Sequence, residues 1–154
     1  MKTFAVLQLA GCAGCEVSLL DADAWLSEYQ LAYLPLIMST HDMPPVDVLL
    51  VSGGVRNDEE LYKLRHAVPQ AGQVVAVGTC AISGGVGSLG DREEVRELFV
   101  AEMGRRHVPR LLPKSRPIDA VVSVDLYLPG CPPTPELFMA ALNESSEVKT
   151  NRIV

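Results

Sequence analysis

The sequence of 154 residues has no run of basic residues and no apolar run long enough to cross a bilayer. Thirteen Lys and Arg residues stand against nineteen Asp and Glu residues, so the formal net charge is −6. Binding to DNA or RNA depends on clustered positive charge, and this composition therefore excludes a nucleic-acid-binding surface. A helix needs about 20 apolar residues to span the hydrocarbon core, so we expect no direct membrane insertion.

A secretory signal is also lacking at the amino terminus. The segment MKTFAVLQLAGC has one lysine and a short apolar stretch, and it reaches glycine and cysteine without a cleavage site or twin arginine. We therefore expect a cytoplasmic protein. In that compartment thiols are kept reduced, so four cysteines are expected to act as metal ligands or redox groups rather than as structural disulfides.

Charged residues are scarce, at 21% of the chain, whereas apolar residues make up 48%. This composition is apolar for a free-standing domain of this size, and we expect part of the apolar surface to face a partner protein. The length predicts one domain, which we place at residues 1–143. A polar tail is expected to follow at residues 144–154.

Short apolar runs rich in β-branched residues alternate with segments of helical period, which is typical of βαβ units. The predicted strands are 3–9, 33–38, 46–52, 73–78 and 118–124. The predicted helices are 15–30, 58–68, 91–103 and 135–143, and residues 104–117 are predicted to form a surface connection. The pattern predicts an α/β fold, a doubly wound parallel sheet in a single domain.

Residues suited to cap or begin a helix precede three of these helices. The expected ones are Asn57 or Asp58 for the second helix, Asp91 for the third, and Thr134 followed by Pro135 for the last. The third helix is expected to turn four side chains inward, those of Val95, Leu98, Phe99 and Met103.

All four cysteines lie in loops that follow predicted strands. Cys12 and Cys15 form a C-x-x-C pair in GCAGCE, directly after the first strand. Cys80 lies in VAVGTCAISGG, after the strand at 73–78, and Cys131 lies in LYLPGCPPTPE, before the last helix. The carboxyl ends of parallel strands meet at one edge of an open α/β sheet, where ligands bind. We therefore expect the four thiols at the same edge.

Three chemistries are compatible with these cysteines. A thioredoxin-like dithiol oxidoreductase uses Cys12 and Cys15 but gives Cys80 and Cys131 no role. A four-cysteine zinc module uses all four, although structural zinc usually takes two C-x-x-C pairs. An iron–sulfur cluster accepts one pair plus single cysteines from distant loops, and it needs glycines where the backbone approaches sulfur. The glycines that flank the thiols are Gly11, Gly14, Gly78, Gly84, Gly85 and Gly130. The spacing favours the cluster and leaves the other two open.

The motifs GCAGCE (11–16), GTC (78–80) and PGCPPTPE (129–136), in this order, resemble the small subunit of nickel–iron hydrogenases, a family related to the 20 kDa subunit of complex I. The segment VDVLLVSGGVRNDEE (46–60) is also similar, so the resemblance covers nearly the whole chain. It implies a flavodoxin-like domain that holds one 4Fe-4S cluster. The ligands that it implies are Cys12, Cys15, Cys80 and Cys131.

The resemblance further implies a non-catalytic, electron-transfer subunit of an oxidoreductase acting on H2. The nickel–iron centre would belong to a separate large subunit, and electrons would pass to a further iron–sulfur or flavin subunit. With no fifth cysteine, the chain is similar to the short cytoplasmic type that works with NAD(P). Small subunits of membrane-bound, energy-converting hydrogenases are the alternative. The flavodoxin-like architecture also raises FMN as a ligand, although no residue of the sequence supports it.

Three further features have more than one interpretation. Glu16, next to Cys15, either belongs to a proton path at the subunit boundary or is a first-turn acid that stabilises the helix dipole. Ser52 stands where periplasmic family members often have a carboxylate. GVGSLG (85–90) matches the Gly-x-Gly-x-x-Gly pattern, but it begins several residues after a strand and no acidic residue follows at the next strand tip. A dinucleotide site is therefore not expected there.

Overall fold

A five-stranded parallel sheet forms the centre of the computed structural model, which describes residues 1–103 and 109–148. Its strands are β1 (Lys2–Gln8), β2 (Tyr29–Tyr33), β3 (Val46–Ser52), β5 (Ala71–Val77) and β7 (Leu126–Leu128). Their spatial order is β2-β1-β3-β5-β7. Counted along the chain among themselves, these strands read 2-1-3-4-5, which is the flavodoxin-like order. The predicted α/β, doubly wound fold is confirmed.

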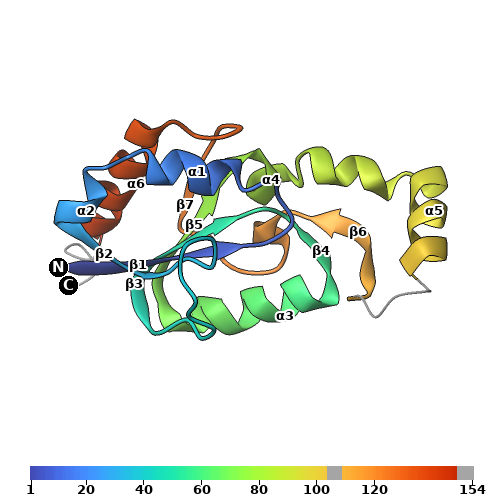
Figure 1. The fold of residues 1–154 in the computed structure, drawn as a ribbon, viewed down its shortest axis with the longest axis horizontal. Helices are drawn as coiled ribbons and strands as arrows, with labels where there is room; N and C mark the ends of the chain where they lie inside the picture. The colour runs from blue at the N-terminus through green and yellow to red at the C-terminus, as the bar shows by residue number, and fades with distance from the viewer. Residues whose placement is uncertain (104–108, 149–154) are drawn as a thin grey trace.

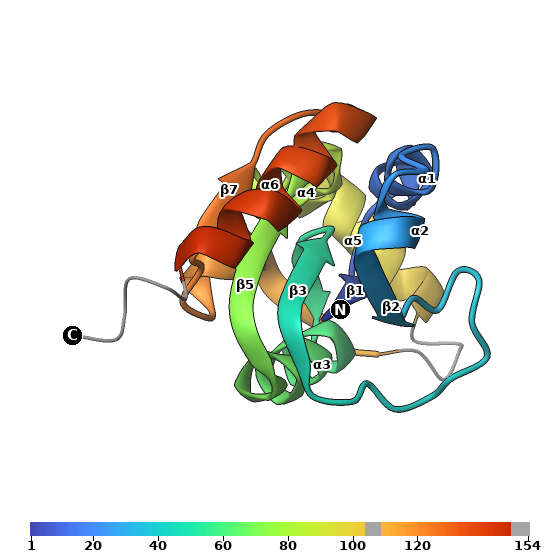
Figure 2. The same ribbon diagram turned by 90° about the vertical axis from the view of Figure 1, so that its left-hand side faces the viewer.

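Helices cover both faces of this sheet, as Figures 1 and 2 show. The helices α1 (Gly14–Leu20), α2 (Trp25–Glu28) and α6 (Pro135–Val148) lie on one face, and α3 (Asp58–Ala67) lies on the other. Because side chains alternate along a strand, the sheet contributes to two hydrophobic cores. Phe4 and Leu50 pack on the first face, whereas Leu49 and Val51 pack on the second.

Smaller elements extend the sheet at its carboxyl end. The strands β4 (Val55–Asn57) and β6 (Leu111–Arg116) pair antiparallel, and α5 (Glu93–Met103) lies beside them, outside the sheet (Figure 1). The helix α4 (Gly78–Ser83) begins where β5 ends. Three 3₁₀ turns complete the elements of the described residues: η1 (Val68–Gln70), η2 (Val86–Asp91) and η3 (Ile118–Ala120). No helix within the described residues is both long and apolar enough to cross a membrane.

The predicted helix 15–30 and strand 33–38 are both wrong in their bounds. The helix breaks after Leu20, where the turn-forming Asp21 follows, and the indole N–H of Trp25 donates to the Leu19 carbonyl across the break at 2.9 Å. The strand β2 lies earlier than predicted and runs from Tyr29 to Tyr33, because these aromatic residues fit a pleated, half-buried surface. Residues 34–38 form a turn instead.

The predicted strand 118–124 is also wrong, because the last strand of the sheet is β7 at Leu126–Leu128. Residues 118–120 form η3, and the β-branched side chains of Val121, Val122 and Val124 pack against the sheet face instead of joining a strand. The surface connection expected at 104–117 is partly a strand, since β6 pairs with β4. Residues 104–108 lie outside the described residues.

The helix α5 begins two residues later than predicted, and Asp91 does not cap it. The Asp91 carboxylate instead accepts hydrogen bonds from the Ser115 N–H and hydroxyl, at 2.9 and 3.1 Å. Leu98 and Phe99, expected inside, are exposed, Leu98 to 72%. The reason is that α5 lies away from both hydrophobic cores and contacts η2 and β6, where Arg96 donates to the carbonyls of Leu112 and Pro113. The side chain of Met103 lies outside the described residues.

The remaining two helices agree better with the sequence. Asn57 caps α3, and its side chain and that of Glu60 form a reciprocal capping box. The last helix begins at Pro135 as predicted but continues to Val148, so residues 144–148, expected in a polar tail, are helical. The rest of the expected tail, residues 149–154, lies outside the described residues.

Phe138 of α6 packs in the hydrophobic core on its face of the sheet, and its side chain is 1% exposed. We expect Phe138→Ala to lower the free energy of unfolding by about 3–5 kcal/mol, because it leaves a cavity in the core. The neighbouring Leu137 is exposed, and Leu137→Ala should cost less than about 1 kcal/mol. Urea denaturation of both variants measures the difference, and equal losses would contradict this packing.

Candidate functional site

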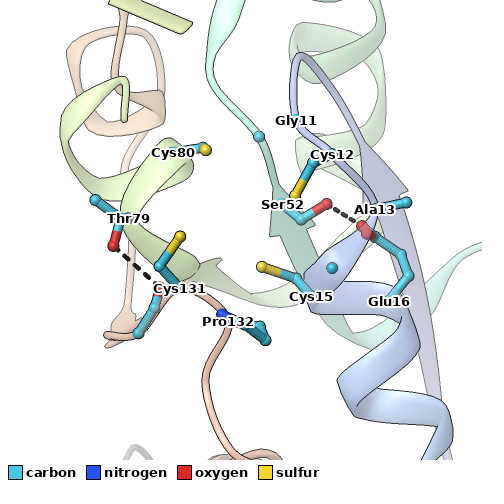
Figure 3. Close-up of a pocket in the computed structure, with 13 residues that line it drawn as sticks. Gly11, Cys12, Ala13, Cys15, Glu16, Ser52, Thr79, Cys80, Cys131 and Pro132 are labelled. Carbon is cyan, nitrogen blue, oxygen red and sulfur yellow. Dashed lines mark hydrogen bonds between the residues drawn. The ribbon is translucent and has the colours of Figure 1, made fainter. Parts of the chain in front are cut away.

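The four cysteine side chains lie together at the carboxyl edge of the sheet. Cys12 comes from the turn between β1 and α1, Cys15 from the first turn of α1, Cys80 from the first turn of α4, and Cys131 from the loop between β7 and α6. All four line one pocket, and Figure 3 shows their sulfur atoms pointing into a shared space between these loops. The structure thus brings together the thiols that the sequence places in three distant segments.

The pocket lies where the order of the strands reverses. The strand β1 has β2 on one side and β3 on the other, so the loops after β1 and β3 leave the sheet in a crevice. Cys12 comes from the first of these loops, Cys15 from the start of the helix α1 that follows it, and Ser52 ends β3 beside them. The cysteines therefore occupy the position in which doubly wound sheets bind their ligands.

Hydrogen bonds fasten the three cysteine-bearing segments to one another. The N–H and the hydroxyl of Thr79, the residue before Cys80, both donate to the Gly130 carbonyl, at 2.9 and 3.0 Å. The Ser18 hydroxyl, on α1, donates to the Pro133 carbonyl at 2.6 Å. The loop around Cys131 is thereby tied to both α4 and α1, which fixes the thiols relative to one another.

Two glycines let the backbone close on the sulfur atoms. Gly78 has φ 79°, and a Cβ placed there would lie 2.6 Å from the Cys15 Sγ. Gly85 has φ 55°, and a Cβ there would lie 2.7 Å from the Cys80 Sγ. A side chain at either position would fill the space beside the sulfur. Close backbone approach of this kind is what iron–sulfur clusters need for N–H donation to their sulfurs.

Burial and nearby negative charge make two of the thiols, those of Cys15 and Cys80, hard to ionise. Burial raises the pKa of Cys15 to about 12, and the negative charges of Glu16, Cys80, Cys12 and Cys131 contribute to the rise, in that order. Burial also raises the pKa of Cys80, followed by the charges of Cys131 and Cys12. A bound cationic centre reverses this balance because it deprotonates its thiol ligands outright. The chemistry of the donor set therefore fits a metal group.

The spacing of the thiols bears on the kind of metal group. Four thiolates on one zinc ion would lie about 4 Å apart, since each Zn–S bond is ~2.3 Å long. Among residues 1–103 and 109–148, no three His, Cys, Asp or Glu side chains are placed to hold a single metal ion. The four thiols thus share one pocket without the arrangement that a single metal ion requires.

Glu16 is a buried acid beside the thiols, with 1% of its surface exposed. The Ser52 hydroxyl donates to the Glu16 Oε1, whereas Oε2 has no hydrogen-bond partner within the described part of the chain. Both residues line the cysteine pocket (Figure 3). Ser52 was not predicted as a site residue, although a serine that ends the apolar strand VDVLLVS is a signal that could have found it.

Gly78 tests how tightly the backbone encloses Cys15. We expect Gly78→Ala to lower the free energy of unfolding by roughly 2 kcal/mol or more, because alanine disfavours a positive φ and its methyl group meets the Cys15 sulfur. At Gly87 a Cβ would meet nothing within 4 Å, so Gly87→Ala is the matched control and should change stability by less than about 1 kcal/mol. Anaerobic urea unfolding compares the two variants, and an undisturbed Gly78→Ala chain would contradict the enclosure.

Comparison with known proteins agrees with this geometry. Residues 12–145 match the profile of the family described as NADH ubiquinone oxidoreductase, 20 Kd subunit. A subunit of the F420-non-reducing hydrogenase vhu of Methanocaldococcus jannaschii is 33% identical over 153 residues, which cover 89% of this chain and 53% of that protein. The NAD-reducing hydrogenase HoxS subunit delta of Cupriavidus necator is 28% identical, over 91% of this chain and 76% of that protein.

A solved structure supports the same relationship. A chain in the crystal structure of an NAD+-reducing nickel–iron hydrogenase in the H2-reduced state is 33% identical and has a TM-score of 0.82. The match covers 92% of this chain and 89% of that chain. The chain spans about half the length of the F420-non-reducing relatives that it matches. Because the family profile matches most of the sequence, the chain belongs to the family of the 20 kDa subunit of NADH ubiquinone oxidoreductase.

Proposed function

We propose that this chain is the electron-transfer small subunit of a cytoplasmic nickel–iron hydrogenase. It would hold one 4Fe-4S cluster through Cys12, Cys15, Cys80 and Cys131, between the nickel–iron site of a large subunit and a further redox subunit. The observation that carries the proposal is the convergence of four thiols from three segments on one pocket. Relatives named as hydrogenase subunits support the reaction class.

The acceptor side of the proposal rests on two of these relatives. The subunit of Cupriavidus necator belongs to an NAD-reducing hydrogenase, and the solved structure is of an NAD+-reducing enzyme. These names support an NAD(P)-linked partner that receives or supplies electrons. No observation on the described residues favours the membrane-bound, energy-converting type over this one.

The four cysteines differ in exposure, and we expect them to bind different sides of the cluster. Cys15 and Cys80 are partly buried and would hold the cluster from inside, whereas Cys12 and Cys131 are exposed and would hold its outer side. When bound, such a cluster supplies reversible one-electron transfer. The backbone at Gly78 and Gly85 approaches the two inner sulfur atoms closely. The outer thiols leave a face at which a partner subunit would come within electron-transfer distance.

Two other chemistries explain less of this geometry. A dithiol oxidoreductase would use Cys12 and Cys15, and it would not explain why Cys80 and Cys131 line the same pocket. Structural zinc usually takes two C-x-x-C pairs, whereas Cys80 and Cys131 are single cysteines on different segments.

Metal analysis tests the proposed function directly. Chain purified anaerobically with whatever it binds should contain about four iron and four acid-labile sulfide per chain, as a cubane requires. A larger, nickel-containing protein should be recovered with it. One zinc per chain, or a metal-free chain that reduces a model disulfide, would show that the assignment is wrong.

A single substitution separates the cluster from the dithiol. Cys131→Ser should lose most of the iron, because it removes one of four ligands, whereas a dithiol reductase would keep its activity. Thr134→Ser is the matched control, since it lies in the same loop, does not line the pocket and preserves the capacity to cap α6. Iron content measured on both chains decides between the two chemistries.

We further propose that Glu16 belongs to a proton path at the subunit boundary, with Ser52 as its neighbour. Support comes from the Ser52–Glu16 hydrogen bond, from the lack of a described partner for Oε2, and from the position of both residues at the cysteine pocket. The other interpretation, a first-turn acid on the helix dipole, needs no contact of this kind. If Glu16 only stabilises the helix dipole, proton transfer in the complex does not depend on its side chain.

Glu16→Gln separates the two interpretations of this carboxyl group. In the hydrogenase complex the substitution should slow H2/D2 exchange by ~100-fold or more, because an amide cannot relay the proton, while iron content stays unchanged. Glu28→Gln, on the exposed surface of α2, is the control and should leave exchange unchanged. Equal exchange rates in the two variants would assign Glu16 a structural role only.

A further inference from the structure

The turn that follows α4 folds back onto the Cys80 side chain. Gly84 ends the helix with φ 86°, and its N–H donates to the Cys80 carbonyl at 2.9 Å. Gly85 then adopts φ 55° and ψ −150°, a conformation that glycine alone adopts readily. A Cβ at Gly85 would lie 2.7 Å from the Cys80 Sγ and 2.9 Å from its Cα. The backbone therefore passes in contact with the sulfur.

The peptide unit between Gly85 and Val86 is held at both ends. Its carbonyl oxygen accepts hydrogen bonds from the Ser88 N–H at 3.2 Å and from the Ser88 hydroxyl at 2.7 Å. In a trans peptide the N–H points opposite to the carbonyl. The Val86 N–H is thereby turned to the side of the peptide that faces the Cys80 sulfur, where a backbone hydrogen bond from Val86 reaches the thiol.

We propose that the Gly85–Val86 peptide, oriented by Ser88, donates a hydrogen bond to the Cys80 sulfur and thereby sets the reduction potential of the bound cluster. Ser88 is a positioning residue in this arrangement, and Gly85 provides the close approach. The inference rests on the proposed function, because it concerns the cluster that Cys80 would hold. This arrangement also gives the GVGSLG motif a role, because its first glycine, Gly85, lets the backbone approach the Cys80 thiol rather than a phosphate group.

The direction of the effect follows from charge. Reduction adds an electron to the cluster and increases the negative charge on its sulfur ligands. A backbone N–H aimed at one of these sulfurs stabilises the reduced form more than the oxidised form, so it raises the potential. Loss of this donor should therefore make the midpoint potential more negative.

Two substitutions at Val86 isolate the donor. Val86→Pro removes the N–H, and proline fits because Val86 is the first residue of η2 and is preceded by a glycine. Val86→Ala keeps the N–H and shortens a side chain that is 72% exposed. In redox titrations of the anaerobically purified full chain, followed by electron paramagnetic resonance, we expect a negative shift for Val86→Pro and the wild-type potential for Val86→Ala.

The outcomes separate this inference from the proposed function. If wild type and Val86→Ala contain no iron, the proposed function is wrong, and so is the proposed effect of the Val86 N–H on the reduction potential. If iron is present and Val86→Pro has the same midpoint potential as Val86→Ala, the proposed effect of the Val86 N–H is wrong, while the proposed function stands.

A second pair covers the case in which Val86→Pro binds no iron. Ser88→Ala removes one of the two hydrogen bonds that orient the peptide, and Ser88→Thr restores a hydroxyl. Ser27→Ala is the control, because its hydroxyl makes the same bond to a carbonyl three residues earlier, on the exposed helix α2. We expect a negative shift for Ser88→Ala alone, with recovery in Ser88→Thr. Equal potentials in Ser88→Ala and Ser27→Ala would contradict the proposal.

Discussion

Parallel pairing of the strands β1, β3 and β5 is the constraint on which the cysteine site depends. Val6 lies beside Leu50 and Leu50 beside Val75, so these strands point the same way and end at the same edge. The pairing of β7 with β5 brings the Cys131 loop to that edge as well. Thiols separated by dozens of residues in the sequence thus meet without a local metal-binding loop, and the hydrophobic cores on both faces hold this arrangement.

The site combines close backbone approach with unfavourable charge. The glycine backbone lies close to Cys15 and Cys80, and burial together with the charges of the neighbouring thiols raises the pKa of both. In such a pocket a cationic iron–sulfur core would offset the repulsion, whereas a free dithiol would gain nothing from it. Hydrogen bonds from Thr79 and Ser18 to the Cys131 loop hold the segments that carry the four thiols together.

Much of this could be predicted from the sequence, since long apolar runs such as 46–52 and the motifs around the cysteines depend on local residue patterns. The errors arose where tertiary contacts override local propensity. The β-branched run 118–124 packs on the sheet face because β7 takes the edge position beside β5. Leu98 is exposed because α5 lies away from both hydrophobic cores, and hydrophobic periodicity does not reveal where a helix packs.

Within the site, the cysteines follow from their motifs, but the contacts of Ser52 and of the Gly85–Val86 peptide do not. These contacts join residues on different elements or depend on the orientation of one peptide plane, and neither leaves a pattern of residue types.

X-ray absorption at the iron edge of the anaerobically purified chain tests the central claim most directly. If the four thiols enclose one cluster, the spectrum contains sulfur neighbours together with an iron–iron scattering path, and this path is lost when any one of the four cysteines is replaced by serine. Iron without iron neighbours, or a zinc ion surrounded by the four thiolates, would contradict it.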